Sequence, residues 1–373
     1  MTPMIQRRKL IANSSFFAAS VSLPNFGRAA QHRLGLSLPL SGTQAEVAKD
    51  LMTGYELALR AAGGNVTLKV LDDSGSPEKA AKNVEALGLD PQVIGLSGIV
   101  GTPHAQLALP VAVKFGLPVV GIRSGAAALR DGRDGVYHLR ASFEDELNKI
   151  AGMCDGAGYK RVLIIYSEDS FGKGSNEHLI SRLKSLGINE TISYPVDRNG
   201  EKMDKQLDAV GGVIKKSTIG TAVVLLMITQ PMVRALKVLR ENYHSLSPTF
   251  AMSFVAGNLV IGSRDPSLSG LGVVAAFPPA NAINESLIVQ YKKDFAEFGS
   301  LNLAESPTVF EGYLYGSVFM KAIAETASRQ ALVSKLNKGV TFAGQEFKFN
   351  DKKVGFSYLK ILYKNSNDGR FRV

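Results

Sequence analysis

The sequence predicts an α/β protein built from two parallel sheets with helices on their faces. From residue 33 onward, short apolar segments alternate with longer amphipathic segments, which is typical of βαβ units and a parallel sheet. The same alternation starts again near residue 161. With 373 residues, the chain is long enough for two domains that each bury a core.

The first α/β unit contains five expected strands. They cover residues 33–39, 66–71, 92–97, 118–122 and 135–139. Helices are expected between them over residues 44–62, 77–87 and 102–115. The helix at 77 carries its own start signal, since Ser76 can cap it and Pro77 suits the first turn.

The second unit repeats this order. Strands are expected over residues 161–167, 191–196, 221–227 and 248–252, and helices over residues 144–157, 172–186, 201–216 and 231–242. Arg140-Ala141-Ser142 lies between the two units and is expected to be a crossing.

The last third of the chain follows "LGVVAAFPPA" (271–280). Proline ends regular strand pairing, so Pro278-Pro279 predicts a second crossing. Helices are expected over 284–298, 306–327 and 330–338, and β-like segments over 347–350, 356–364 and 370–373. Gly312 and Gly316 share a helix face, and we expect them to pack closely against the sheet.

Residues 1–30 have the anatomy of an export signal. Arg7, Arg8 and Lys9 precede a mildly apolar stretch, and small residues near Ala29/Ala30 suit cleavage. The adjacent arginines resemble the twin-arginine type, and a general secretory signal is the alternative. Either signal places the mature protein in the periplasm. Residues 1–29 carry four positive charges and no acid, so the formal net charge falls from +10 to +6 on cleavage.

The composition and motifs argue against several function classes. The positive charges are scattered without aromatic interleaving, so no nucleic-acid partner is expected. "GIRSG" (121–125) misses the Gly-x-Ser-x-Gly nucleophile elbow by one position, and no Gly-x-Gly-x-x-Gly or Gly-Lys-Ser/Thr cradle occurs. The single Cys154 and the absence of a His-x-x-x-His pair argue against a metal site. Asp72-Asp73 fits a turn better than a metal or catalytic pair. We expect no catalytic residue, cofactor or metal.

Seven stretches, in order, resemble one family. They include "HRLGLSLPLSGTQAEVAKDLMTGYELALRAAGG", "VLDDSGSPEKAAKNVEAL", "LPVVGIRSGAAAL" and "FEGYLYGSVFMKAI". They are similar to the leucine/isoleucine/valine-binding proteins, the type I periplasmic substrate-binding proteins of ABC importers. The resemblance covers essentially all of the mature chain.

The resemblance implies the type I periplasmic binding protein fold, with two Rossmann-like lobes joined by three crossings. We expect the first lobe to comprise residues 31–141 and 277–344, and the second lobe residues 142–276 and 345–373. It also implies a small-molecule ligand that closes the lobes about a hinge, and an ABC permease with its ATPase in the inner membrane as partners. We expect a monomer.

The resemblance also places the ligand site at the strand ends of both lobes. In the first lobe the matching residues are Glu46, Val100, Gly101, Thr102, Arg123, Ser124 and Gly125. In the second lobe they are Phe171, Thr229, Gln230 and Phe254.

The ligand class follows from where the sequence departs from the family. Amino-acid binders place an acid for the ligand ammonium where this chain reads Met252-Ser253-Phe254-Val255. An unpaired buried ammonium is costly, whereas Arg123 suits a carboxylate. We therefore expect the ligand to be an organic carboxylate with an aromatic or branched apolar body. An amino acid is the less favoured ligand.

Two kinds of alternative stay open. Arg123 could form a structural salt bridge, and Phe171 and Phe254 could simply pack within their lobe. At the level of the molecule, a periplasmic ligand sensor for a membrane partner or an exported α/β enzyme is the alternative to an importer's receptor.

Overall fold

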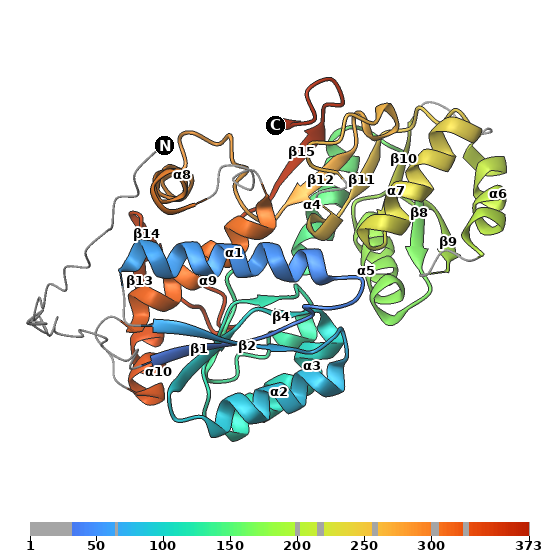
Figure 1. Cartoon of the computed structure of the whole chain (residues 1–373). Helices are drawn as coiled ribbons and strands as arrows, with labels where there is room; N and C mark the ends of the chain where they lie inside the picture. The colour runs from blue at the N-terminus through green and yellow to red at the C-terminus, as the bar shows by residue number, and fades with distance from the viewer. Residues whose placement is uncertain are drawn as a thin grey trace, which may run out of the picture.

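The computed structural model describes residues 32–63, 66–197, 202–214, 220–255, 260–299, 306–323 and 328–372. The expected export signal, residues 1–30, lies outside them. The described chain forms two α/β lobes that lie side by side, each around its own sheet (Figure 1). Blue and cyan elements build the lower lobe together with orange ones, and green to yellow elements build most of the other.

The first lobe contains a five-stranded parallel sheet in the order β2-β1-β3-β5-β7. Its strands are β1 (His32–Leu38), β2 (Val66–Asp72), β3 (Val93–Ser97), β5 (Val119–Val120) and β7 (Val136–Tyr137). Successive side chains point to opposite faces of a strand. Val119 and Val120 accordingly enter two different hydrophobic cores, one on each face of the sheet.

Helices cover both faces of this sheet. The helices α1 (Ala45–Ala62), α8 (Ser286–Phe298), α9 (Pro307–Ile323) and α10 (Arg329–Lys338) share one core, and α2 (Pro77–Leu89) and α3 (Thr102–Lys114) share the other. The helix α2 begins where the sequence predicts, because Ser76 Oγ accepts a hydrogen bond from the backbone N–H of Lys79 at 3.3 Å.

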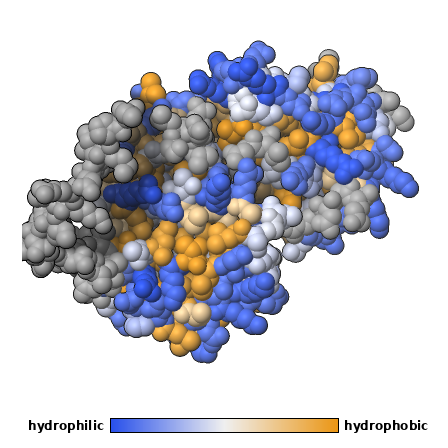
Figure 2. All heavy atoms as spheres, in the orientation of Figure 1, coloured by the Kyte–Doolittle hydropathy of each residue, from blue (hydrophilic) through white to orange (hydrophobic). Residues whose placement is uncertain are grey.

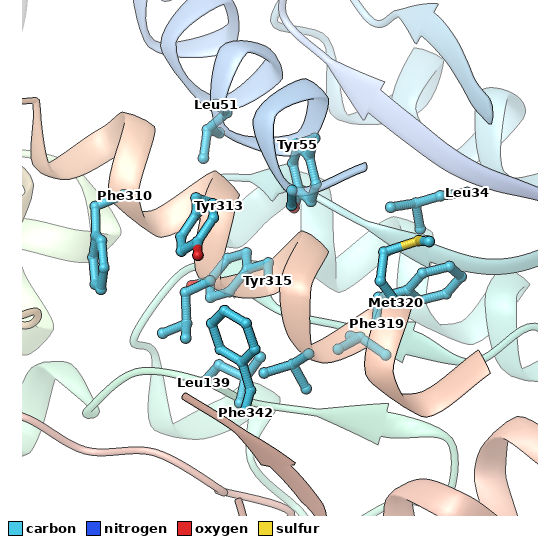
Figure 3. Packing of buried hydrophobic residues seen from close by; sticks show 14 of the residues in the cluster. Leu34, Leu51, Tyr55, Leu139, Phe310, Tyr313, Tyr315, Phe319, Met320 and Phe342 are labelled. Atoms are coloured by element: carbon cyan, nitrogen blue, oxygen red, sulfur yellow. The ribbon is translucent and has the colours of Figure 1, made fainter. Parts of the chain in front are cut away.

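The helices α1 and α9 approach each other through glycines. A Cβ atom on Gly54 would lie 2.1 Å from the carbonyl oxygen of Val309, and one on Gly312 would lie 2.2 Å from that of Leu51. The expectation that Gly312 packs against the sheet is therefore wrong, since its face of α9 is turned toward α1. Large side chains, among them Tyr313, surround this contact (Figure 3).

The second lobe contains a seven-stranded sheet in the order β16-β15-β12-β11-β10-β8-β9. Its strands are β8 (Arg161–Ser167), β9 (Glu190–Val196), β10 (Thr221–Leu226), β11 (Thr249–Ala251), β12 (Gly272–Ala275), β15 (Lys360–Lys364) and β16 (Phe371–Arg372). The strands β8 to β12 are parallel, and β15 and β16 add an antiparallel edge. The helices α4 (Phe143–Gly156) and α5 (Ser170–Ser185) share one core with the sheet, while α6 (Met203–Ile214) and α7 (Thr229–Lys237) share the other.

The chain passes between the two sheets three times: after β7, after β12 and before β15. Before the last passage, β13 (Val340–Phe342) pairs with β14 (Gln345–Phe347), and Phe347 is buried in the first lobe. The backbone of His138 then exchanges hydrogen bonds with Lys353 and Gly355 at 2.8 and 2.9 Å. Residues 345–355 thus lie with the first lobe, and the passage comes later than the boundary expected at 345.

Some apolar side chains of the first lobe are partly exposed at its surface. Figure 2 shows them over the region of β1 and β2, where the edge strand β2 leaves Val66, Leu68 and Val70 only half-buried. Among the described residues, no helix has both the length and the apolar character that a membrane crossing requires.

Candidate functional site

Two loops of the first lobe lie side by side at the strand ends. The short strands β4 (Ile99–Val100) and β6 (Ile122–Arg123) pair in parallel, with Val100 opposite Arg123. This pairing brings the loops that follow into contact, so that the hydroxyl oxygens of Thr102 and Ser124 lie 2.8 Å apart. The carboxyl ends of neighbouring parallel strands meet at one edge of a sheet, which explains why residues 22 positions apart in sequence come together.

Gly125 has a packing role. Its carbonyl oxygen accepts a hydrogen bond from the backbone N–H of Phe143 at 2.7 Å. A Cβ atom at this position would lie 2.5 Å from the Phe143 ring. Only glycine therefore allows the start of α4, in the second lobe, to approach this loop of the first lobe so closely.

Three aromatic rings meet at the edge of the second lobe. Phe171, in the first turn of α5, and Phe254, after β11, have ring centroids 5.2 Å apart. Phe143 completes the cluster, at 5.4 Å from Phe171 and 5.8 Å from Phe254. All three pairs are edge-to-face, the arrangement that the quadrupoles of aromatic rings favour. The rings are half-buried, so the cluster packs the lobe and still presents a face outward.

The other predicted residues lie at the margins of this arrangement. Thr229 donates a hydrogen bond to the carbonyl oxygen of Phe254 at 3.5 Å, which ties the loop after β10 to the one after β11. Gln230 and Glu46 are exposed, in the first turns of α7 and α1.

Arg123 is paired with an acid. Its guanidinium contacts the carboxylate of Glu311 in α9, and its side chain is 11% exposed. Glu311 also accepts a hydrogen bond from the Tyr315 hydroxyl at 2.7 Å. The salt bridge that the sequence left open as an alternative for Arg123 is therefore present. It fixes the guanidinium in place without excluding a further contact from its other nitrogens.

The ion pair belongs to a larger network that joins the lobes. Arg140, in the crossing after β7, lies 3.2 Å from Glu311 of the first lobe and 3.2 Å from Glu146 of the second. The hydroxyl group of Ser253, after β11, accepts a hydrogen bond from Arg140 at 2.7 Å and donates one to Glu146 at 2.7 Å. Two arginines and two glutamates thus form a continuous chain from Arg123 to Ser253.

Burial and charge pairing compete within this network. Burial alone would lower the pKa of Arg140, but Glu311 and Glu146 outweigh it and raise that pKa. Burial raises the pKa of Glu146, while Arg140 and the Ser253 hydrogen bonds oppose this shift. The charges compensate one another. Removing one partner would leave the other charge buried and unpaired, and its desolvation would then lower the stability of the protein.

A cavity of about 340 Å³ lies beside the network, bordered by both lobes and the crossing after β12. Its ionic lining residues are Arg123, Arg140, Lys292, Arg370 and Glu311. Its apolar and aromatic walls include Phe254, Val273, Val274, Phe277, Ile288, Tyr291, Phe310, Leu362 and Phe371. Such a volume and such a mixture of apolar walls with a few ionic groups are typical of small-molecule sites.

The cavity and the predicted site overlap in part. All the predicted site residues are described, and of these Arg123 and Phe254 line the cavity. The others lie on the neighbouring strand ends. Sequence reasoning missed Arg140, Phe277, Tyr291 and Phe310. The signal for Arg140 was present in the sequence, since Arg140 directly follows the strand expected over residues 135–139, as Arg123 follows the one expected over 118–122.

Metal-binding side chains and the single cysteine can be located in the described part of the chain. No group of three or more metal-binding side chains occurs among them. Cys154 is buried, which raises the pKa of its thiol to about 12 and leaves it unreactive at neutral pH. Asp72 accepts hydrogen bonds from Leu40 and Ser74 backbone N–H groups, as the turn interpretation predicts.

Comparisons with known proteins agree with this architecture. A family model described as periplasmic binding protein matches residues 31–353. A possible leucine/isoleucine/valine-binding protein from Rhodopirellula baltica has a TM-score of 0.77 at 21% identity, over 92% of this chain and 97% of its own. The leucine binding protein LivK from Thermotoga maritima also has a TM-score of 0.77, at 16% identity, over 92% of this chain and 98% of its own.

A fatty acid ABC transporter substrate-binding protein from Thermomonospora curvata has a TM-score of 0.75 at 16% identity, over 91% of this chain and 90% of its own. At these identities the structural matches establish the fold. No curated protein matches the sequence.

Proposed function

This chain belongs to the periplasmic binding protein family of non-enzymatic receptors, and we propose that it is the periplasmic solute receptor of an ABC importer for a small organic carboxylate. The family model covers most of the chain, and the fold is the type I periplasmic binding protein fold. Structures with this fold include an ABC transporter substrate-binding protein in complex with Leu and a fatty acid ABC transporter substrate-binding protein, which supports the transport role.

The charge of the cavity lining carries the ligand proposal. Four of its five ionic side chains are cationic, and two of these, Arg123 and Arg140, are largely buried. A guanidinium binds a carboxylate through charge-assisted hydrogen bonds. The surrounding walls are apolar and aromatic, so they suit a ligand with an apolar body.

The same lining does not suit an α-ammonium group. Among the described residues that line the cavity, Glu311 carries the only carboxylate. That carboxylate already accepts hydrogen bonds from Arg123, Arg140 and Tyr315. An ammonium would have to compete with three donors for it, or remain unpaired in a buried site.

Ligand contact with both lobes supplies the mechanism. The cavity walls come from α8 and α9 of the first lobe and from β12, β15 and β16 of the second. A ligand that contacts both sets of walls binds one relative arrangement of the lobes better than others and shifts the population toward it. The importer would then recognise that arrangement.

Matched pairs of ligands test this function. We expect 3-phenylpropanoate and 4-methylpentanoate to raise the melting temperature by several degrees, since ligand at 100 times its Kd stabilises the native state by about 2.7 kcal/mol. Phenylalanine and leucine, which add only an ammonium to these acids, and 3-phenylpropanamide, which removes the charge, should have little effect. Differential scanning fluorimetry measures these shifts.

A variant pair makes the test specific. Arg123→Met should lose most of the stabilisation, whereas Arg133→Met should keep it, since Arg133 pairs with Asp131 and does not line the cavity. Stabilisation by the amino acids and not by the acids would overturn the proposed ligand class.

A further inference from the structure

Two residues that line the cavity each carry a buried donor without a partner. The Tyr291 side chain is fully buried and Arg140 is 2% exposed. Neither the Tyr291 hydroxyl nor the Arg140 Nε has a hydrogen-bond partner among the residues that the structure describes. Buried polar groups are nearly always paired, and an unpaired one lowers stability. Both atoms belong to residues of the same cavity wall.

The neighbouring tyrosines show that this is particular to Tyr291. The Tyr313 ring packs 5.0 Å from the Tyr291 ring, and its hydroxyl donates to Asp294 at 2.6 Å. Tyr315 donates to Glu311 at 2.7 Å. The same aromatic core therefore satisfies two of its hydroxyls and leaves unsatisfied the hydroxyl of Tyr291, a residue that lines the cavity.

A row of aromatic side chains connects Arg140 with Tyr291. The Arg140 guanidinium lies 6.0 Å from the centre of the Phe277 ring. Phe277 lies 6.1 Å from Phe310, and Phe310 lies 5.2 Å from Tyr291. Two phenyl rings thus form a row from the Arg140 guanidinium to the Tyr291 ring.

We propose that the ligand is an aryl carboxylate with a second polar group on its ring, and that Tyr291 is the residue that recognises this second group. The inference rests on the proposed function and narrows its ligand class. The carboxylate binds at Arg123 and Arg140, the apolar body lies along Phe277 and Phe310, and a ring hydroxyl pairs with the Tyr291 hydroxyl.

Both anchors are held in place before any ligand arrives. The other nitrogens of Arg140 bond to Glu311, Glu146 and Ser253, which fixes the plane of the guanidinium and the direction of Nε. Tyr291 packs against Phe295 at 5.4 Å as well as against Phe310 and Tyr313. Preorganised donors lose little freedom on binding. Burial raises the pKa of Tyr291, so its hydroxyl stays protonated and able to donate.

Calorimetric titration with two probes tests the inference. The wild-type protein should bind 3-(4-hydroxyphenyl)propanoate about 3- to 10-fold more tightly than 3-phenylpropanoate, the range expected for one buried hydrogen bond. Tyr291→Phe should abolish this preference. Tyr313→Phe, a matched change in the adjacent ring, should keep it.

Melting of the ligand-free protein provides an independent readout. Tyr291→Phe removes an unpaired hydroxyl and should leave the melting temperature unchanged or raise it slightly. Tyr313→Phe breaks the bond to Asp294 and should lower it by about 2–4 °C. A loss of stability in Tyr291→Phe as large as that in Tyr313→Phe would show that a structural partner, such as a bound water, serves this hydroxyl, and would overturn the inference.

The outcomes separate this inference from the proposed function. Equal binding of both probes by the wild type, or binding of 4-methylpentanoate but of neither aryl acid, overturns the role of Tyr291 and leaves a carboxylate receptor in place. Failure of every acid to bind overturns the receptor for carboxylates itself.

Discussion

Arg123 and His138 show how differently a basic side chain can be accommodated inside the protein. Arg123 forms an ion pair with Glu311 at the edge of a cavity. His138 lies after β7 and is 1% exposed. Its Nε2 forms a hydrogen bond with the carbonyl oxygen of Leu129 at 3.1 Å, and its Nδ1 has no hydrogen-bond partner among the described residues. Burial, and then the neighbouring Arg130, lower the pKa of His138 to about 3. This histidine is therefore neutral in the folded protein at physiological pH.

The depressed pKa of His138 predicts a pH dependence of stability. The unfolded chain takes up a proton near pH 6.5 and the folded chain does not, so the stability due to His138 is fully present above pH 6.5. It is lost as the pH falls from there toward 3, by about 1.4 kcal/mol per unit. Thermal or denaturant unfolding between pH 7.5 and 4.5 measures this loss.

The matched variant for this prediction is His138→Gln, which keeps a polar group near Leu129 and cannot take up the proton. Its stability should fall less steeply over the same pH range than that of the wild type, even if it is lower at pH 7.5. Parallel slopes for the two proteins would contradict the burial argument for His138.

At the scale of elements, the contact between α1 and α9 determines the shape of the first lobe. These helices touch backbone to backbone at Gly54 and Gly312, and a methyl group at Gly312 would overlap the carbonyl group of Leu51. Since α9 also carries Glu311 and Phe310 to the cavity, its position against α1 sets one wall of the site.

Alanine substitution tests this contact. Gly312→Ala should destabilise the protein by about 2–4 kcal/mol, because two backbones must separate to admit the methyl group. Gly152→Ala, in the exposed face of α4 with nothing within 4 Å, should stabilise it by up to about 1 kcal/mol through helix propensity. Urea unfolding of both variants gives the comparison, and equal effects would refute the close packing.

The sequence predicts the regular elements well because their signals are local. Ser76 and Pro77 indicate the start of α2, and the alternation of apolar and amphipathic segments predicts the strands of both sheets. The hairpin of β13 and β14 escaped prediction as a unit because its strands have three residues each, too few for a period to appear. This hairpin is also why the last crossing comes later than expected.

The site was only partly predictable for a different reason. Arg123 stands out in sequence as a charge at a strand end, but Glu311, its partner, lies 188 positions away on a helix. Tyr291 and Phe310 read as core positions of amphipathic helices, and they are indeed buried. No local sequence pattern distinguishes an aromatic residue that packs against a neighbouring element from one that lines a cavity.

At the scale of the whole molecule, the network from Arg123 to Ser253 and the cavity beside it occupy the place where the lobes are joined. Each lobe contributes charges, and the crossing residue Arg140 connects them. A ligand bound there would contact the walls of both lobes, and under the proposed function an importer would recognise the resulting arrangement. The proposed function therefore places an organic acid between the lobes, held there by arginine.

A crystal structure of the protein with 3-(4-hydroxyphenyl)propanoate tests this claim most directly. We predict the carboxylate within hydrogen-bond distance of the Arg123 or Arg140 guanidinium, the ring along Phe277 and Phe310, and the hydroxyl at Tyr291. A ligand seated instead at Thr102 and Ser124 with no arginine contact, or an empty cavity at saturating concentration, would contradict it.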